Sequence, residues 1–358
     1  MNYFVADPDW GFWIIAYFYL GGIAAGSYFL AVLIEWFGSE EDQPLARTGY
    51  YLAFPLVLLC TIFLIVDLNR PERFWHMLLK SETVKAAFDA GFPLSLDGWR
   101  LALSSPAIKY WSPMSLGAWV LLVFGACSFA SFVTTVWPKR GPGKWLRSAW
   151  PHGVLQVMGC VSGFFIAAYT GALLSATNQP MWSDTTWLAA LFLASAASTS
   201  LAAMNLIAWR WKLGSEAARR RLADAEPLAL GLELVVLAAF LASLGANLAA
   251  VMHTVRGNVL IFGTVAVGVL LPLLLHALVG DRRRWRLPAT AAVVLLGGLL
   301  LRYGVLTTPG ELLARGPDRA ASFGPEAVRR VGQPGADVLN RRGTEVQPRS
   351  KLIDREKQ

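Results

Sequence analysis

The sequence predicts an all-α integral membrane protein with eight transmembrane helices and both termini on the extracytoplasmic side. Hydrophobic residues make up 55% of the 358 residues and charged residues only 16%, a composition untypical of a soluble domain of this length. The apolar residues form runs of about 20, the length of a helix that crosses the hydrocarbon core. These runs lack the alternation of barrel strands, so we expect helices throughout.

Eight apolar runs provide the predicted spans. Asp7 and Asp9 precede the first run and no basic segment does, so the N-terminus is not typical of a cleaved signal peptide. Within that run, Gly22 and Gly26 have the four-residue spacing that lets membrane helices approach closely. In chain order, the runs are 11–36, 48–66, 113–136, 152–176, 187–209, 228–251, 259–280 and 289–307.

Basic residues in the connections predict the orientation. Four Lys or Arg follow the third run, five follow the fifth and four follow the seventh, whereas the fourth connection has none and the sixth has only Arg256. The positive-inside rule therefore places the odd-numbered connections in the cytoplasm. The formal net charge of +8 is explained by these loops and the tail, so it indicates topology and not nucleic-acid binding.

Two polar segments remain, and both are expected outside the membrane on the extracytoplasmic side. Residues 67–112 form a long second connection that is too polar to face lipid. Residues 308–358 form a polar tail after a membrane domain of residues 1–307. Such a tail is disordered on its own, and the alternative is that it lies against a partner protein.

Cysteine and histidine usage limits the cofactors that this protein can bind. Cys60, Cys127 and Cys160 each stand alone in a span, so we expect no iron–sulfur cluster and no metal site. His152 and His276 are the only rough candidates for a pair of haem ligands. The better interpretation is that they are interfacial or hydrogen-bonded histidines, and the protein is predicted to bind no haem.

Charged residues within or beside the spans are the candidates for proton chemistry, because such residues are energetically costly in a membrane. Asp67 and Arg70 follow the second run, and Glu233 lies inside the sixth. Glu233 is interpreted either as part of a structural buried pair or as the start of an inner proton path. Glu35 and Arg302 are expected to extend to the membrane interface.

Polar and aromatic groups from several spans gather on the predicted outer side. A cavity lined by rings and a few hydrogen-bond donors suits an amphipathic ring with an apolar tail, so we expect a quinone to bind there. The residues expected at this site are Tyr17, Asp67, Arg70, Tyr169, Asn178 and His253.

Five stretches give the sequence a resemblance to the NrfD/PsrC family, the polysulfide-reductase-type membrane subunits. They are YFYLGGIAAGSYFLA (17–31), DLNRPERFWHML (67–78), SPMSLGAW (112–119), YTGALLSATNQPMW (169–182) and GGLLLRYGVL (297–306). The resemblance implies two four-helix bundles, no haem, and a menaquinone or ubiquinone site near the outer face of the bacterial inner membrane. It also implies a ferredoxin-like iron–sulfur subunit above that site, linked to a molybdopterin catalytic subunit or a multihaem cytochrome.

The resemblance also implies roles for individual residues. In the family's polysulfide reductase, quinone is held by a His and an Asn of the first helix and a Tyr of the fourth. The fourth-helix Tyr matches Tyr169, whereas Tyr17 stands at the His position and Trp13 at the Asn position. Tyr17 can donate a hydrogen bond, but Trp13 cannot replace an amide acceptor.

The predicted function is that of a haem-free membrane anchor that exchanges electrons between quinone and an extracytoplasmic iron–sulfur partner. Proton translocation is a further possibility, with Asp67, Arg70 and His253 on the outer side and Glu233 on the inner side. The alternatives are a membrane transporter, which the buried charges would allow, and a cytochrome b-type haem anchor.

Overall fold

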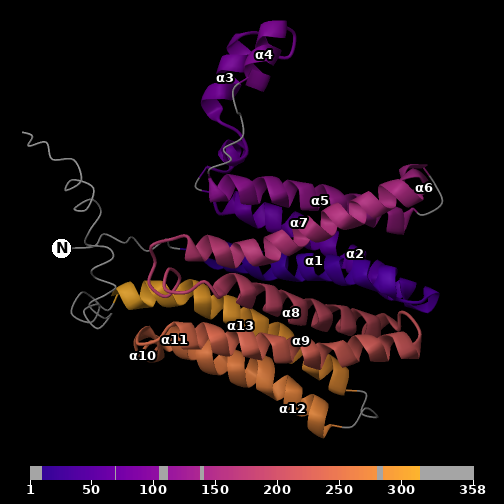
Figure 1. The fold of residues 1–358 in the computed structure, drawn as a ribbon, viewed down its shortest axis with the longest axis vertical. Coiled ribbons are helices and arrows are strands. Elements are labelled where there is room, and N and C mark those ends of the chain that lie inside the picture. The colour runs from indigo at the N-terminus through magenta and orange to yellow at the C-terminus, as the bar shows by residue number, and fades with distance from the viewer. Residues whose placement is uncertain (1–9, 69, 105–111, 138–140, 280–284, 315–358) are drawn as a thin grey trace, which may run out of the picture. The chain divides into compact units, whose positions relative to one another are not determined.

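The computed structural model describes residues 10–68, 70–104, 112–137, 141–279 and 285–314. Within these ranges the secondary structure consists of helices joined by turns and loops, with no β-strand (Figure 1). Eight helices are long and apolar enough to cross a membrane. This confirms the predicted all-α fold with eight candidate spans, and the protein is a multi-pass membrane protein.

The eight spans are separated by short helices in the connections. The spanning elements are α1 (Phe12–Phe37), α2 (Gln43–Val66), α5 (Pro113–Val136), α7 (Ala149–Ser175), α8 (Leu188–Trp211), α9 (Glu216–Ser243), the continuous run of α11 (Val255–Asn258), π-helical η3 (Val259–Leu270) and α12 (Leu271–Leu278), and α13 (Arg286–Ala314). The connections contain η1 (Glu40–Asp42), η2 (Pro71–Met77), α3 (Ser81–Asp89), α4 (Leu96–Ser104), α6 (Gly141–Leu146) and α10 (Asn247–Met252).

The sixth span differs most from its prediction. It runs from Glu216 to Ser243, not over 228–251. The Ser215 hydroxyl caps the helix by accepting from the backbone of Ala218, and the helix continues through Pro227. It is followed by Gly245 with a positive φ of 52°, a conformation that favours glycine. The arginines 219–221, expected in a connection, therefore lie in the first turns of α9.

Helix contacts fall into two groups. In the first helix group (α1, α2, α5 and α7), α1 packs against α2 and α7, and α5 packs against the same two helices. In the second helix group (α8, α9, η3–α12 and α13), α8 packs against α9 and α13, and α13 packs against η3. The groups meet where α1 packs against α8 and α13 and where α7 packs against α8. The two separate four-helix bundles implied by the family resemblance stay a prediction.

Glycines bring the two groups together. An added Cβ at Gly26 of α1 would lie 2.7 Å from the carbonyl oxygen of Ala196 of α8, and one at Gly22 would lie 3.2 Å from Nη2 of Arg302. The glycine spacing that predicted close helix approach is thus used between α1 and the second helix group.

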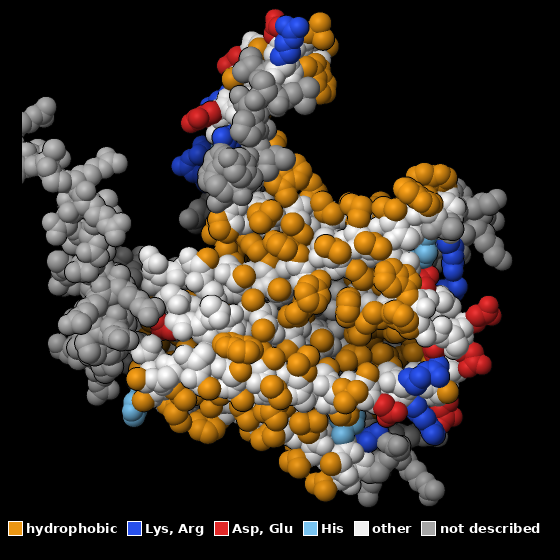
Figure 2. Space-filling model, in the orientation of Figure 1, with side chains coloured by type: hydrophobic (Ala, Val, Ile, Leu, Met, Phe, Trp, Pro, Cys, Tyr) orange, Lys and Arg blue, Asp and Glu red, His pale blue; other side chains and the backbone are white. Residues whose placement is uncertain are grey.

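The two ends of the helices differ in charge. Where α1 ends and α2 begins, Arg47, Arg147, Lys212 and several further arginines gather with acidic residues; we call this the basic end (Figure 2). Arg221 of α9 forms an ion pair with Asp42 at 2.6 Å there. Hydrophobic side chains cover much of the helix surface between the ends. The assignment of the basic end to the cytoplasm stays a prediction, and the connection residues 138–140 and 280–284 and most of the predicted tail (315–358) lie outside the described residues.

Candidate functional site

Tyr17 and Tyr169 lie close to one another in the first helix group. Tyr17 of α1 is buried, at 7% exposure, and its phenol group interacts electrostatically with that of Tyr169 of α7. The Cys60 thiol of α2 donates to the Tyr17 carbonyl oxygen at 3.7 Å. A side chain at Gly117 of α5 would overlap the Tyr169 ring, so this glycine makes room for it. The structure therefore brings together the two tyrosines that the sequence nominated.

The two hydroxyl groups differ in availability. Tyr169 donates its hydroxyl hydrogen to the carbonyl oxygen of Pro113 at the start of α5. Among the described residues, the hydrogen bond found at Tyr17 is the one that its carbonyl oxygen accepts from Cys60, and none is found for its hydroxyl. A phenol has one hydrogen to donate, so Tyr17 is the donor that a ligand can use without breaking a bond in the protein.

The other predicted outer residues are spread over the end of the helices opposite the basic end, which we call the opposite end. Asp67 and Arg70 follow α2, both are exposed, and neither forms an ion pair with a described residue. Partial burial raises the pKa of the Asp67 carboxyl above its usual value. Trp13, at the position of the family's Asn, is 40% exposed and its ring lies 5.3 Å from that of Phe63.

Asn178 and His253 are exposed residues at the same end. Asn178 follows the end of α7, and His253 ends α10. The nearby Trp182 is fully buried. Its indole nitrogen donates to the Val305 carbonyl oxygen at 2.7 Å, and its ring stacks on Trp10. The loop before α8 therefore folds inward against the start of α1.

A buried charged cluster lies in the second helix group. Arg302 of α13 is 1% exposed, donates to the Ser195 hydroxyl, and donates to the Phe192 carbonyl oxygen at 3.2 Å. Glu233 of α9 accepts from the Ser198 hydroxyl at 2.5 Å and interacts electrostatically with Arg302. The prediction that Arg302 extends to the interface is wrong, because its guanidinium finds its partners on α8 within the protein.

Sequence reasoning missed Glu226, a second buried acid on α9. It is 0% exposed, accepts from Asn205 at 2.8 Å, and interacts electrostatically with Arg286. The sequence held a signal for it, because Glu226 and Glu233 have a seven-residue spacing that places them on one helix face. The signal was lost because the sixth span was predicted to begin after Glu226.

The two histidines considered as haem ligands each lie beside a carboxylate. His152 Nε2 is 2.9 Å from Glu35 Oε1, and His276 Nε2 is 4.0 Å from Glu226 Oε2. The interpretation of His152 as a hydrogen-bonded histidine is confirmed. Glu35 was expected to extend to the interface; it lies near the end of α1, and its carboxylate accepts hydrogen bonds from Tyr50 and Gln156, so its place relative to the interface stays a prediction.

A groove of about 800 Å³ runs along the start of α1 on the side of α13. Its lining is mostly apolar and includes Tyr19, Phe63, Tyr303 and Arg256. None of the site residues predicted from sequence lines this groove. Tyr19 lines the groove and Tyr17 does not, because residues two apart in a helix point in different directions. The two tyrosine side chains therefore have different neighbours.

The family described as "Polysulphide reductase, NrfD" matches residues 6–312, nearly the whole chain. The chain belongs to the NrfD family. The resemblance carried by the five sequence stretches is thereby confirmed.

Three relatives illustrate the range of the NrfD family matches. The protein is 26% identical to Protein NrfD of Escherichia coli over 317 residues, which cover 83% of its own length and 93% of that relative. It is 26% identical to a polysulfide reductase chain of Wolinella succinogenes over 55% of its own length and 57% of the relative. It is 32% identical to a selenate reductase subunit of Mesobacillus selenatarsenatis over 79 residues, 22% of its own length and 18% of the relative. The matched regions thus span about half of the polysulfide reductase protein and under a fifth of the selenate reductase protein.

Proposed function

We propose that this protein is the quinone-binding membrane subunit of a bacterial inner-membrane oxidoreductase complex. In this proposal it exchanges electrons between membrane quinone, either menaquinone or ubiquinone, and an extracytoplasmic iron–sulfur subunit. Membership of the NrfD family supports the proposal, as do the names of the polysulfide and selenate reductase relatives. The observation that carries it is the buried Tyr17 side chain, whose phenol group lies beside that of Tyr169.

The residues at this position fit a quinone head group. A quinone supplies two-electron, two-proton chemistry and has two carbonyl oxygens that accept hydrogen bonds. Tyr17 provides one donor directly, and Tyr169 provides a second if its hydroxyl turns away from Pro113. The rings of Phe18 and Phe165, which pack against the two tyrosines, provide apolar contact.

At the opposite end, residues other than the two tyrosines are placed to carry protons. Asp67 lies at the end of α2, and burial raises the pKa of its carboxyl, which extends the pH range in which it holds a proton. We assign proton release to the extracytoplasmic side during quinol oxidation to Asp67, and Arg70 and His253 are exposed at the same end.

The second connection is proposed as the docking element for a ferredoxin-like iron–sulfur subunit. The Trp119 indole of α5 donates to the Leu78 carbonyl oxygen at 2.9 Å, which fixes the end of η2 to the first helix group. Beyond it, the α3–α4 hairpin exposes large apolar side chains. Leu94 is 98% exposed, Leu96 78% and Phe88 58%. Exposed apolar patches of this kind mark interaction sites, and the iron–sulfur subunit would in turn join a molybdopterin catalytic subunit or a multihaem cytochrome.

The experiment compares Tyr17→Phe with Tyr19→Phe in the assembled complex. Each variant removes one hydroxyl from α1, but Tyr17 faces Tyr169 whereas Tyr19 faces the groove. A photoreactive quinone analogue is bound, its affinity is measured, and its cross-linked peptides are mapped. One lost hydrogen bond of about 0.5–1.5 kcal/mol predicts that Tyr17→Phe weakens binding by roughly two- to tenfold.

We expect Tyr19→Phe to retain wild-type affinity and the label to fall on α1 and α7. A label on Leu299, Leu300 or Tyr303 of α13, together with weaker binding in Tyr19→Phe, would move the site to the groove. The absence of saturable quinone binding in the wild-type complex would refute the proposed function.

A further inference from the structure

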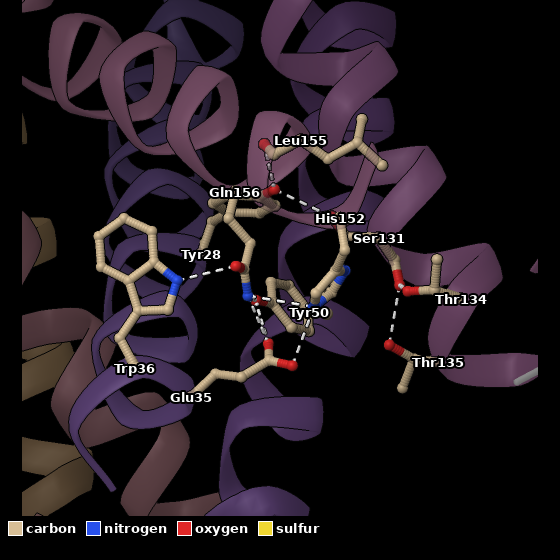
Figure 3. A network of polar contacts seen from close by, with 10 residues as sticks. All are labelled: Tyr28, Glu35, Trp36, Tyr50, Ser131, Thr134, Thr135, His152, Leu155 and Gln156. Atoms are coloured by element: carbon tan, nitrogen blue, oxygen red, sulfur yellow. Dashed lines mark hydrogen bonds and ion pairs between the residues drawn. The ribbon is translucent and has the colours of Figure 1, made fainter. Parts of the chain in front are cut away.

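A polar network joins three helices of the first group at the basic end (Figure 3). Its centre is the Glu35 carboxylate of α1. Tyr50 of α2 donates to Glu35 at 2.8 Å, as does Gln156 of α7, and His152 of α7 lies 2.9 Å away. At the edge of the network, the Trp36 indole donates to the Gln156 amide oxygen at 2.8 Å.

A second polar pair lies deeper in the same helices. The Tyr28 hydroxyl is 2.9 Å from the Ser131 hydroxyl of α5 and donates to the Leu155 carbonyl oxygen at 3.0 Å. The rings of Tyr28 and Tyr50 are in edge contact, with centroids 5.2 Å apart. Figure 3 shows Glu35, Tyr50, Tyr28 and Ser131 in one region of the first helix group. The step from Tyr50 to Tyr28 has no described hydrogen bond, so it requires a water molecule or the rotation of a hydroxyl.

The outer edge of the network faces a small polar cavity. The cavity has a volume of about 10 Å³ and is lined by Glu35, Arg47, Tyr50, Arg147 and His152 together with threonines of α5. This is close to the ~10–15 Å³ that one water molecule needs. The charged groups that face Glu35 and His152 are therefore Arg47 of α2 and Arg147 before α7, and the titratable neighbours are Tyr50 and Tyr28.

His152 is built to accept a proton. Glu35 already accepts hydrogen bonds from Tyr50 and Gln156, and such bonds favour a charged carboxylate. The imidazole is the member of the pair that can accept a further proton, because it has two ring nitrogens. The Nδ1 atom of His152 is buried and has no hydrogen-bond partner among the described residues, and the residue lines the small cavity.

The pair is a poor choice for stability alone. A buried ion pair often stabilises a protein no more than well-packed apolar residues of the same volume, and ionisable residues in membrane helices usually serve a function. We propose that Glu35 and His152 form a proton-loading site at the basic end. It takes up a proton from the aqueous phase on that side and delivers it through Tyr50, Tyr28 and Ser131 toward the Tyr17–Tyr169 region.

This inference rests on the proposed quinone function, because quinone reduction consumes two protons along with two electrons. The electrons come from the iron–sulfur partner, and the protons come from the basic-end aqueous phase through His152. The site at Glu35 and His152 is separate from Asp67 and from Glu233, which lie at the other end of α2 and in the second helix group.

The test uses Glu35→Gln, which keeps the shape and removes the charge. The matched control is Trp36→Phe, which removes only the indole donor at the network edge. The full-length protein, without quinone, is labelled with ¹⁵N-histidine, and the titration of the His152 ring is followed by NMR. The assembled complexes are then placed in vesicles, and quinone reduction and proton uptake on each side are measured with a reductant for the iron–sulfur partner.

We expect His152 to titrate in the wild type and at lower pH in Glu35→Gln, because the neutral amide no longer stabilises the imidazolium. We expect turnover in Glu35→Gln to fall by roughly a hundredfold, the lower range for loss of an acid–base group, with unchanged quinone affinity. Trp36→Phe should retain turnover and basic-end proton uptake. A His152 ring that does not titrate, wild-type turnover in Glu35→Gln, or proton uptake from the opposite end would each overturn the inference. A wild-type complex that binds no quinone would instead refute the proposed function, while the NMR titration would still be readable.

Discussion

Glu226 and Glu233 lie on one face of α9, and each is hydrogen-bonded to α8. Asn205 donates to Glu226 at 2.8 Å, and Ser198 donates to Glu233 at 2.5 Å. Asn205 and Ser198 are themselves seven residues apart, so the same kind of contact repeats after about 10 Å of helix. The second helix group therefore holds two buried acids in line, with Arg302 beside the one farther from the basic end.

Removing Arg302 alone tests whether this cluster is structural. Arg302→Met leaves the Glu233 carboxylate buried without its cation, so we expect a loss of about 3–5 kcal/mol in the free energy of unfolding. Adding Glu233→Gln should recover part of that loss, because the two residues are coupled. Thermal unfolding of the four members of this double-mutant cycle in detergent measures the coupling. Additive effects would show that the two residues do not act as a pair.

Tyr169→Phe should destabilise the protein even without quinone. The Tyr169 hydroxyl donates to Pro113, and a hydrogen bond of this kind contributes about 0.5–1.5 kcal/mol. Thermal unfolding of the quinone-depleted protein measures this effect. Unchanged stability together with weaker quinone binding would mean that the hydroxyl faces the ligand and not Pro113.

Charge on the α3–α4 hairpin should weaken attachment of the iron–sulfur partner. Leu94→Asp combined with Leu96→Asp alters the most exposed apolar side chains of the hairpin. Loss of a contact worth about 1.4 kcal/mol lowers affinity tenfold, and we expect at least that effect in a pull-down titration. Arg100→Ala is the matched control, since it removes only an ion pair that is 80% exposed at both residues. Equal binding by the wild type and the double variant would place the partner on another surface.

Two glycine substitutions should have opposite effects on stability. A Cβ at Gly26 would lie 2.7 Å from the Ala196 carbonyl oxygen, whereas a Cβ at Gly231 of α9 would meet nothing within 4 Å. Gly26→Ala should therefore separate α1 from α8 and lower the unfolding temperature. Gly231→Ala should raise it slightly, because alanine is favoured over glycine by about 1 kcal/mol in a helix. A stable Gly26→Ala variant would show that α1 and α8 are not held this closely.

Reporter fusions test the orientation. The short connection between α8 and α9 contains Gly214 at the basic end, and a reporter inserted there should behave as cytoplasmic. A reporter fused at Gly316, beyond the described residues, should behave as extracytoplasmic. Opposite labelling at either position would reverse the assignment of the basic end and the proposed source of the protons.

The number of spans was predictable because hydrophobic length depends on local sequence. Helix ends were less so: Arg219 to Arg221 are charged and therefore resemble a loop, yet the Ser215 cap starts the helix before them. Side-chain partners were the least predictable. His152 and Glu35 are 117 residues apart in the sequence, and only the packing of α7 on α1 makes them neighbours. Arg302 was misjudged for the same reason, since its position near a helix end gave no sign of Ser195 on α8.

The buried indole of Trp182 has a consequence for how a hydrophobic molecule gets in. Trp182 lies against Trp10 and is bonded to α13 through Val305, so the loop before α8 packs over the water-facing ends of α1 and α13. If the proposed quinone binds, the groove that α1 and α13 leave open is the route by which its apolar tail would arrive sideways, from within the lipid. A water-soluble partner seated on the opposite end would cover those helix ends without blocking this route, so protein docking and exchange of the lipid-soluble carrier can proceed at the same time.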